Sequence, residues 1–315
     1  MPMARSARAT LLVLGVTFVT AAIILLDTVG GLTYTITVGS AALLFAVIAA
    51  AFTRRQRLEL CWLDARVDRV DLAVIAALYI MVFGGFLLSF QVFGIDNVLG
   101  LFLSFGAAML VGSVGPIVYT VWIRQRPLGA LGIGLGNWRL TASLALVFAA
   151  VQFALTLARV DYPSAQTWLP LLAMALVVGL FEAVFFRGFI QNRLEAAFGL
   201  VPAVAIAAAL YGLYHVGYGM GWSEIGFLAG LGIVYAVAFR VAGSILVLWP
   251  LLTPLGSLFN QLQAGDVVLP LESILGFANV FGLMVAALWL ARRYERRHPR
   301  NAPKTMRELP VPRAV

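Results

Sequence analysis

The sequence has few charged residues, few histidines and a single cysteine. Charged residues make up 11% of the 315 residues, whereas a soluble domain has about 25%. Because Cys61 is alone, an internal disulfide bond and a metal site built from cysteines are both excluded. The two histidines leave little from which to build a catalytic zinc centre, which takes about three protein ligands. The composition therefore excludes an ordinary soluble domain and a disulfide scaffold.

The sequence is rich in long runs of apolar residues. Hydrophobic residues make up 62% of the chain, and runs of about 20 residues match a helix that crosses a ~30 Å hydrocarbon layer. Helices are required there because a lipid-facing backbone must satisfy its own hydrogen bonds. The sequence predicts an all-α polytopic membrane protein with about ten transmembrane helices. These are expected at residues 9–27, 32–53, 71–93, 98–123, 140–158, 167–198, 200–219, 223–240, 243–263 and 272–291.

The basic residues indicate how these helices are oriented. They lie in alternate connections, for example at Arg54, Arg124 and Arg193, whereas the connections at 27–32 and 94–97 have none. Basic connections stay in the cytoplasm, so both termini are predicted to be cytoplasmic. The net charge of +8 is thus explained by topology, and no nucleic-acid partner is expected. Arginine-rich, lysine-poor usage is typical of a GC-rich bacterial genome, which predicts the bacterial inner (plasma) membrane.

These patterns divide the chain into three parts. Residues 1–128 hold about four spans and are interpreted as an accessory N-terminal part. Residues 129–298 contain the polar residues described below, together with the last helix. Residues 299–315 are rich in proline and arginine and are predicted to be a disordered basic tail.

Ionisable residues inside apolar spans are costly, so each one needs a reason. Glu182 and Arg187 lie five residues apart on one predicted helix, and Tyr211 and His215 lie near the end of the next. A third polar stretch contains Thr253, Ser257 and Asn260. A carboxylate that faces an imidazole can activate water as a general base, and nearby amide donors can stabilise an oxyanion.

Helix geometry predicts that these groups share one depth. The hairpin between the first two helices turns near Gly199, which lies 17 residues after Glu182 and 16 residues before His215. At 1.5 Å per residue both side chains lie about 25 Å from the turn. A later span enters from the same side and is expected to bring Gly256 and Asn260 to a similar level.

Each of these residues also has a purely structural interpretation. Glu182 and Arg187 can form an internal ion pair that fixes helix packing. His215 can be an interior histidine with a hydrogen bond, Tyr211 can be ordinary packing, and the third stretch can bond between helices. The convergence of three polar groups at one depth favours a functional site.

The three stretches resemble the motifs of the CPBP family of intramembrane proteases, which includes type II CAAX prenyl endopeptidases and bacteriocin-processing or immunity proteins. The stretch from Glu182 to Arg187 resembles Glu-Glu-x-x-x-Arg, that from Tyr211 to His215 resembles Phe-x-x-x-His, and the last resembles His-x-x-x-Asn. The resemblance covers residues 130–265 and rests on the order and spacing of the motifs. The chain departs from the family pattern at Ala183, Tyr211 and Gly256, which replace Glu, Phe and His.

This resemblance implies an intramembrane endopeptidase that hydrolyses peptide bonds of membrane-embedded or lipid-anchored substrates. It implies that Glu182 activates water with the help of His215, that Asn260 holds the oxyanion, and that Arg187 positions the glutamate helix. Supporting roles fall to Tyr211, Thr253 and Ser257. The implied partners are the lipid bilayer and a hydrophobic peptide or membrane-protein substrate.

The residues available at the site also bear on cofactors and on competing functions. Only Glu182 and His215 are offered as metal ligands, so a zinc site is disfavoured and no cofactor is expected. Ala183 and Gly256 leave a second interpretation open, a catalytically inactive membrane scaffold or binding protein, because losing one oxyanion donor costs about 10²–10³ in rate. A transporter, the third interpretation, predicts paired broken helices in two halves, and the sequence has no convincing pair.

Overall fold

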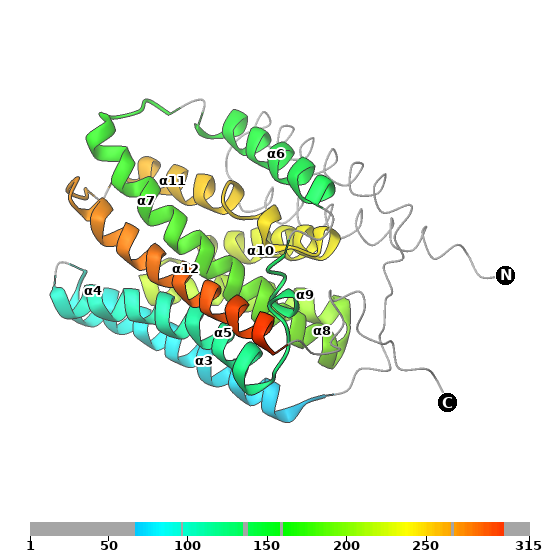
Figure 1. Cartoon of the computed structure of the whole chain (residues 1–315). Helices are drawn as coiled ribbons and strands as arrows, with labels where there is room; N and C mark the ends of the chain where they lie inside the picture. The colour runs from blue at the N-terminus through cyan, green and yellow to red at the C-terminus, as the bar shows by residue number, and fades with distance from the viewer. Residues whose placement is uncertain (1–66, 96, 135–137, 158–159, 266–267, 299–315) are drawn as a thin grey trace, which may run out of the picture.

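The computed structural model of this chain describes residues 67–298, apart from residues 96, 135–137, 158–159 and 266–267 (Figure 1). Within these residues every regular element is a helix, which confirms the all-α prediction for this part of the chain. The predicted spans at 9–27 and 32–53 and the predicted tail at 299–315 lie outside the described residues.

Many of the helices change their winding along their length, and the segments labelled η are π-helical or 3₁₀-helical. The elements in chain order are α3 (Arg69–Leu87), η1 (Leu88–Phe93), α4 (Val98–Phe105), η2 (Gly106–Val114), α5 (Gly115–Val118), η3 (Tyr119–Ile123), η4 (Leu128–Leu131), α6 (Trp138–Leu155), α7 (Ala165–Glu182), η6 (Ala183–Gln191), α8 (Asn192–Phe198), α9 (Leu200–Leu213), η7 (Tyr214–Tyr218), α10 (Trp222–Ala242), η8 (Ile245–Val247), α11 (Leu252–Ala264) and α12 (Ser273–Arg297).

Six helical stretches of the described residues are long and apolar enough to cross a membrane. They are Arg69–Phe93, Val98–Ile123, Ala165–Phe198, Leu200–Tyr218, Trp222–Ala242 and Ser273–Arg297. Their length and composition fit a multi-pass membrane protein. The total of about ten spans and the cytoplasmic position of both termini stay predictions.

The predicted span at 243–263 is not one helix, and this expectation was wrong. Gly243 ends α10 in the left-handed conformation, with a φ of 66°, and the hydroxyl of Ser244 then accepts a hydrogen bond from the backbone N–H of Leu246. The continuous helix resumes only at Leu252. The apolar run predicts one helix because hydropathy does not register a glycine in the left-handed conformation, which ends a helix.

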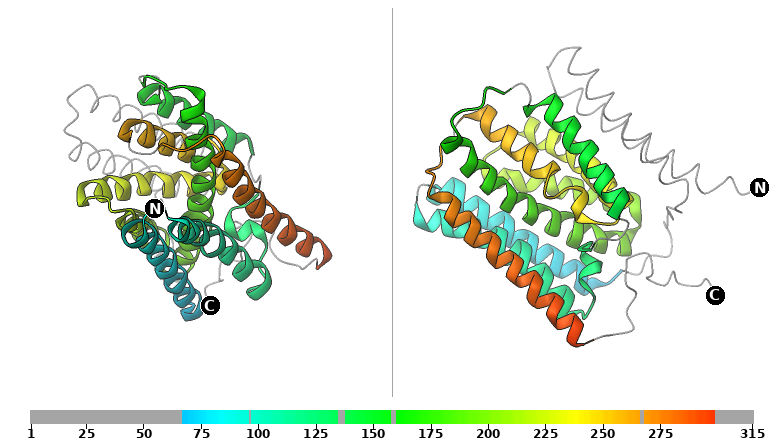
Figure 2. Two further views of the ribbon diagram at one scale, coloured as in Figure 1. Left: turned by 90° about the vertical axis from the view of Figure 1, so that its left-hand side faces the viewer. Right: turned by 45° about the horizontal axis from the view of Figure 1, so that its top comes forward.

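The helices form a bundle in which α7 lies between α11 and α12 (Figure 1). Two further views show α3 and α6 on opposite sides of this bundle (Figure 2). One buried cluster includes Phe86 of α3, Phe181 of α7 and Phe239 of α10. Described residues on either side of the predicted boundary at residue 128 therefore pack into one shared hydrophobic cluster.

A close approach of α9 and α10 sets the position of one end of the site. A Cβ atom at Gly212 would lie 2.7 Å from the carbonyl oxygen of Ile225, so the two backbones can meet there only because residue 212 is glycine. This contact fixes α9 against α10 one residue after Tyr211 and three residues before His215.

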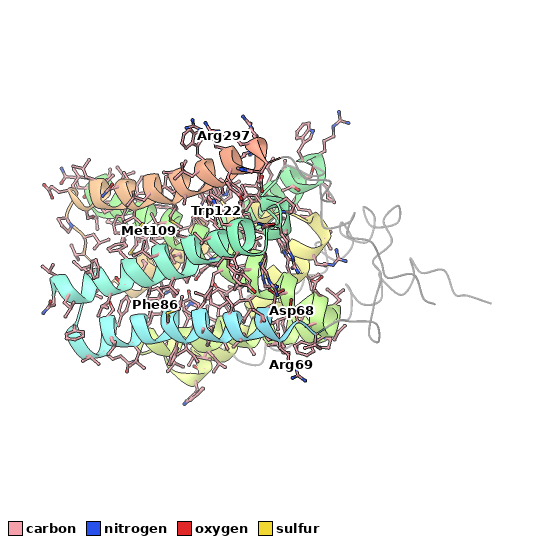
Figure 3. The ribbon with its side chains drawn as sticks, turned by 60° about the horizontal axis from the view of Figure 1, so that its bottom comes forward. Asp68, Arg69, Phe86, Met109, Trp122 and Arg297 are labelled. Carbon is pink, nitrogen blue, oxygen red and sulfur yellow. The ribbon has the colours of Figure 1, made fainter. Side chains whose placement is uncertain are left out.

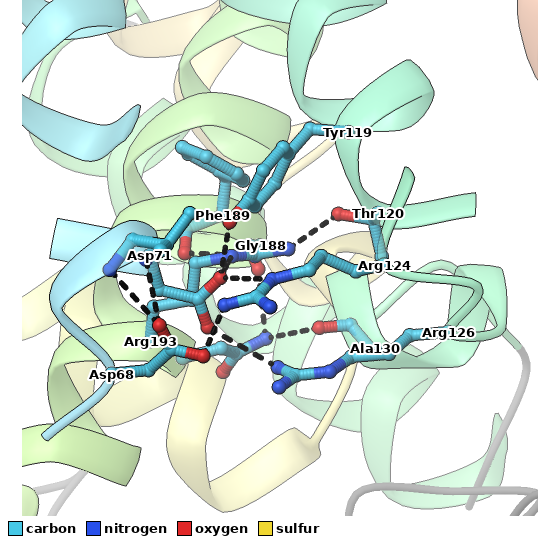
Figure 4. A network of polar contacts seen from close by, with 12 residues as sticks. Asp68, Asp71, Tyr119, Thr120, Arg124, Arg126, Ala130, Gly188, Phe189 and Arg193 are labelled. Atoms are coloured by element: carbon cyan, nitrogen blue, oxygen red, sulfur yellow. Dashed lines mark hydrogen bonds and ion pairs between the residues drawn. The ribbon is translucent and has the colours of Figure 1, made fainter. Parts of the chain in front are cut away.

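A polar network centred on Asp71 ties three helical stretches together at one end of the bundle (Figure 4). The Asp71 carboxylate accepts hydrogen bonds from the Tyr119 hydroxyl at 2.6 Å and from Nε of Arg124 at 2.9 Å. Arg124 also pairs with Asp68, the N-cap residue of α3. Nε of Arg193 lies 3.8 Å from Asp71. The network therefore joins the start of α3, the end of η3 and the start of α8.

Basic residues gather at this same end. Figure 3 shows Arg69 and Arg297 toward the end of the bundle that carries Asp68. Arg240, in the last turn of α10, forms an ion pair of 3.0 Å with Glu195 of α8. Basic ends of spans face the cytoplasm, so the described helices fit the predicted orientation, which stays a prediction.

Candidate active site

Glu182 is the last residue of α7, and the chain continues directly as the π-helical segment η6. Hydrogen bonds in a π-helix run to the fifth residue along the chain, so residues five apart come close to the same face. Glu182 and Arg187 have this spacing. Both contact Tyr211, whose hydroxyl lies 3.3 Å from Oε2 of Glu182 and whose ring lies 5.1 Å from Cζ of Arg187.

The Glu182 carboxylate is held by two tyrosine hydroxyls and faces one imidazole. Tyr214 donates a short hydrogen bond to Oε1, and Tyr211 donates to Oε2. Nε2 of His215 lies 4.0 Å from Oε1. Glu182 and His215 are 9% and 7% exposed. The hairpin count from Gly199 predicted that these two side chains meet, and the structure brings them together.

The hydrogen bond of His215 determines which of its two ring nitrogens carries the proton. The other nitrogen has a free lone pair and faces the Glu182 carboxylate. Nδ1 lies 2.9 Å from the backbone carbonyl oxygen of Tyr211, and a carbonyl oxygen can only accept, so Nδ1 carries the proton. In the neutral ring Nε2 is then an acceptor on the side of Glu182. A gap of 4.0 Å between Nε2 and Oε1 allows one water molecule to lie about 2.8 Å from both atoms.

Aromatic side chains surround the group formed by Glu182, Tyr214 and His215. The Tyr214 ring centroid lies 4.8 Å from that of Phe186 and 5.9 Å from that of Phe86. The Tyr218 ring, in turn, lies 4.7 Å from Phe86 of α3. Nε2 of Gln91 donates to the carbonyl oxygen of Val216 at 2.5 Å, which fastens η1 to the segment that carries His215. Electrostatic interactions inside such an apolar wall are stronger than in water.

Part of the third polar stretch also lies near Glu182. The Thr253 side chain is buried, and a Cβ atom at Gly179, three residues before Glu182, would lie 2.7 Å from its hydroxyl oxygen. A Cβ atom at Gly256 would lie 3.6 Å from the hydroxyl of Tyr235. The space beside residue 256 therefore faces a tyrosine hydroxyl on α10.

Asn260 and Ser257 do not reach the site. Asn260 is exposed and Ser257 is half-buried, and neither side chain forms a hydrogen bond with another described residue. Leu258 packs with Leu171, which lies 11 residues before Glu182, or about 16 Å along the helix. The expected shared depth of Asn260 was wrong because the non-helical segment after Gly243 carries α11 farther along the bundle than a helix would.

Two residues of the site were not singled out from the sequence. No role was predicted for Tyr214, although it lies in the stretch from Tyr211 to His215 and, three residues after Tyr211, shares a helix face with it. Tyr235 gave no local signal, because its partners lie on α9 and α11. Pairing between distant helices cannot be read from an apolar run.

The described residues around Glu182 do not fit a catalytic zinc ion. Glu182 and His215 are two ligands, whereas such a site takes about three. Among the described residues no group of three histidine, cysteine or acidic side chains could hold a metal ion.

The fold and this site define a multi-pass helical membrane protein with a buried carboxylate and imidazole. Residues 164–251 match the family described as type II CAAX prenyl endopeptidase, Rce1-like. The match confirms the resemblance to the CPBP intramembrane proteases and includes Glu182, Arg187, Tyr211 and His215, but it ends before Thr253 and Asn260. No curated protein and no solved structure matches the chain.

Proposed function

We propose that this protein is an intramembrane endopeptidase that cleaves membrane-embedded or lipid-anchored peptides. The observation that carries the proposal is the buried pair of Glu182 and His215, with Nε2 4.0 Å from Oε1. The family match at residues 164–251 supports it, because that segment contains both residues. We further propose the bacterial plasma membrane as the location.

In the proposed mechanism a water molecule lies between Oε1 of Glu182 and Nε2 of His215. Glu182 takes a proton from the water as general base. The water oxygen forms a bond to the carbonyl carbon of the substrate, and the peptide C–N bond breaks. The proton then passes from Glu182 to the leaving nitrogen, so that one water molecule yields a carboxylic acid and an amine.

The tyrosines have a positioning role in this mechanism. The hydroxyls of Tyr211 and Tyr214 hold one oxygen each of the Glu182 carboxylate, which leaves lone pairs on both oxygens for water. Tyr235 and Thr253 are the hydroxyl donors near this group that could contact the oxyanion, in place of the expected Asn260. Preorganised donors of this kind stabilise developing charge.

The proposal is tested by incubating the purified protein, in detergent or liposomes, with a library of hydrophobic and lipidated peptides. We expect cleavage by the wild type and its loss in His215→Ala. Equal inactivity of the folded wild type and variant across such a library, in liposomes of several lipid compositions, would favour the inactive scaffold instead.

A metal chelator is expected to leave the activity unchanged within about twofold, because the described residues provide two ligands where catalytic zinc takes about three. The rate of cleavage is measured after incubation with EDTA or 1,10-phenanthroline and dialysis. Loss of activity that zinc restores would contradict this expectation and would require ligands beyond Glu182 and His215.

Replacing Tyr214 by Phe is expected to lower kcat by about tenfold or more, because a hydrogen bond to a charged group contributes about 1.5–3 kcal/mol. The ring and its aromatic contacts are kept, so the fold should not change. Tyr162→Phe, at an exposed tyrosine, is the matched control. If both variants cleave at the wild-type rate, the Tyr214 hydroxyl does not position Glu182.

A further inference from the structure

The last turns of α12 carry a group of arginines on one side of the helix. This group, which we call the basic stripe, consists of Trp289, Arg292, Arg293, Arg296 and Arg297, and all five side chains are exposed. Residues three, four, seven and eight positions apart lie on one face of a helix, and the five residues have this spacing. Cζ of Arg293 lies 5.3 Å from the centre of the Trp289 ring. Figure 3 shows Arg297 at the end of this helix.

The opposite face of the same turns is fixed to the rest of the protein. Ala291 is fully buried, and the Tyr294 ring lies 5.5 Å from that of Trp122. The Glu295 carboxylate accepts a hydrogen bond from the backbone N–H of Leu128. The only acidic side chain of these turns is therefore turned inward, and the basic stripe faces away from the bundle.

The charge of the basic stripe is not neutralised by the described residues. None of its arginines forms an ion pair with a described acidic side chain. Arg292 and Arg296 are four residues apart, as are Arg293 and Arg297, and like charges at this spacing destabilise a helix. Membrane orientation needs basic residues near the end of a span but not on one face of it. The alignment on one face therefore favours an anionic partner.

The basic stripe begins at the depth where lipid headgroups begin. Arg292 follows Ser273, the first residue of α12, by 19 residues, or about 28 Å along the helix, and the hydrocarbon layer is ~30 Å thick. Only 17% of the most apolar window of α12 is buried, the smallest share among the six candidate spans of the described residues. An exposed tryptophan such as Trp289 is typical of the membrane interface. The neighbours of the basic stripe are therefore lipids.

We propose that the basic stripe binds the headgroups of anionic phospholipids in the leaflet at this end of the bundle. Guanidinium groups donate paired hydrogen bonds to phosphate oxygens, and the aliphatic part of an arginine side chain can lie along the apolar region below. A cluster of about four or more basic residues directly beyond a membrane span is typical of anionic lipid binding. This proposal does not depend on the protease activity.

The test measures lipid binding to the full-length protein in a neutral detergent by native mass spectrometry. Phosphatidylglycerol and phosphatidylcholine with the same acyl chains are added in separate titrations, because both contain phosphate and only the first has a net negative charge. We expect the wild type to bind phosphatidylglycerol about tenfold or more tightly than phosphatidylcholine. Equal binding of the two lipids by the wild type would overturn the proposal, whatever the variants do.

Two double variants with the same net charge show whether the basic stripe is responsible. Arg292→Gln with Arg296→Gln should weaken binding of phosphatidylglycerol by about tenfold or more. The matched control is Arg69→Gln with Arg139→Gln, which removes two exposed arginines elsewhere and should change this binding by less than about threefold. An equal loss in both double variants would show an effect of net charge alone and would overturn the assignment to α12.

A competition experiment distinguishes lipid from free phosphate. Sodium phosphate should displace phosphatidylglycerol no more than sodium chloride of the same ionic strength does, because both salts screen charge. Stronger displacement by phosphate would show a site for the free anion and would overturn the assignment to a lipid.

Discussion

Replacing Glu182 by Gln is expected to reduce peptide cleavage by about 10²–10⁴-fold, the usual contribution of a general base. Glutamine keeps the size of the side chain. Its carbonyl oxygen can accept a hydrogen bond from one of the two tyrosine hydroxyls and its amide N–H can donate to the other, but it cannot take a proton from water. The aromatic wall around the site should therefore stay in place. The single-turnover rate of cleavage in detergent measures the effect, because it reports the chemical step without product release.

A matched control for this experiment is Glu224→Gln. Glu224 accepts a hydrogen bond from the backbone N–H of Gly221 at the start of α10, and glutamine fills the same capping position. This variant should cleave at the wild-type rate. A Glu182→Gln protein that retains more than about a tenth of the wild-type rate would remove Glu182 from the role of base.

Replacing Asp71 by Asn is expected to lower the free energy of unfolding by about 3–5 kcal/mol, the cost of removing one partner from a buried ion pair. The Asp71 side chain is 8% exposed and that of Arg193 only 2%. Loss of the negative charge leaves Arg193 and Arg124 without their buried counter-charge, while Asn preserves the side-chain shape. Reversible unfolding in mixed micelles gives the change in free energy.

Asp161→Asn provides the comparison, since Asp161 is exposed and a surface charge contributes about 0–1 kcal/mol. A second variant tests the cause. If the unpaired cation is responsible, Arg193→Gln in the Asp71→Asn background should recover part of the lost stability. Equal stability of Asp71→Asn and Asp161→Asn would show that the network in Figure 4 does not hold these helices together.

The meeting of Glu182 and His215 could be predicted from the sequence because it depends on one local fact. Two helices joined at Gly199 run side by side, and counting residues from the turn gives the depth of each side chain. The contact of 4.0 Å between them agrees with that count. The catalytic roles of the two residues stay proposals.

The positions of Asn260 and Tyr214 could not be predicted by counting residues from a turn. The depth of Asn260 depended on an unbroken helix from Arg240 onward, and the left-handed Gly243 interrupts it. The contact of Tyr214 with Glu182 depends on the direction of a side chain across two helices, which an apolar pattern does not encode. The Asp71 network could not be predicted for a similar reason. Asp71 pairs with Arg124 and Arg193, which lie 53 and 122 positions later in the sequence.

The contacts of α3 with η7 limit how this protein can be cut or recombined. Phe86 and Gln91 lie outside residues 164–251, the segment that carries the family match, yet they hold the turn that bears His215. A chimera that received only residues 164–251 would contain Glu182 and His215 but would lack Phe86 and Gln91, which contact the segment that carries His215. A transplant of this site therefore has to include α3 and η1 together with the matched segment.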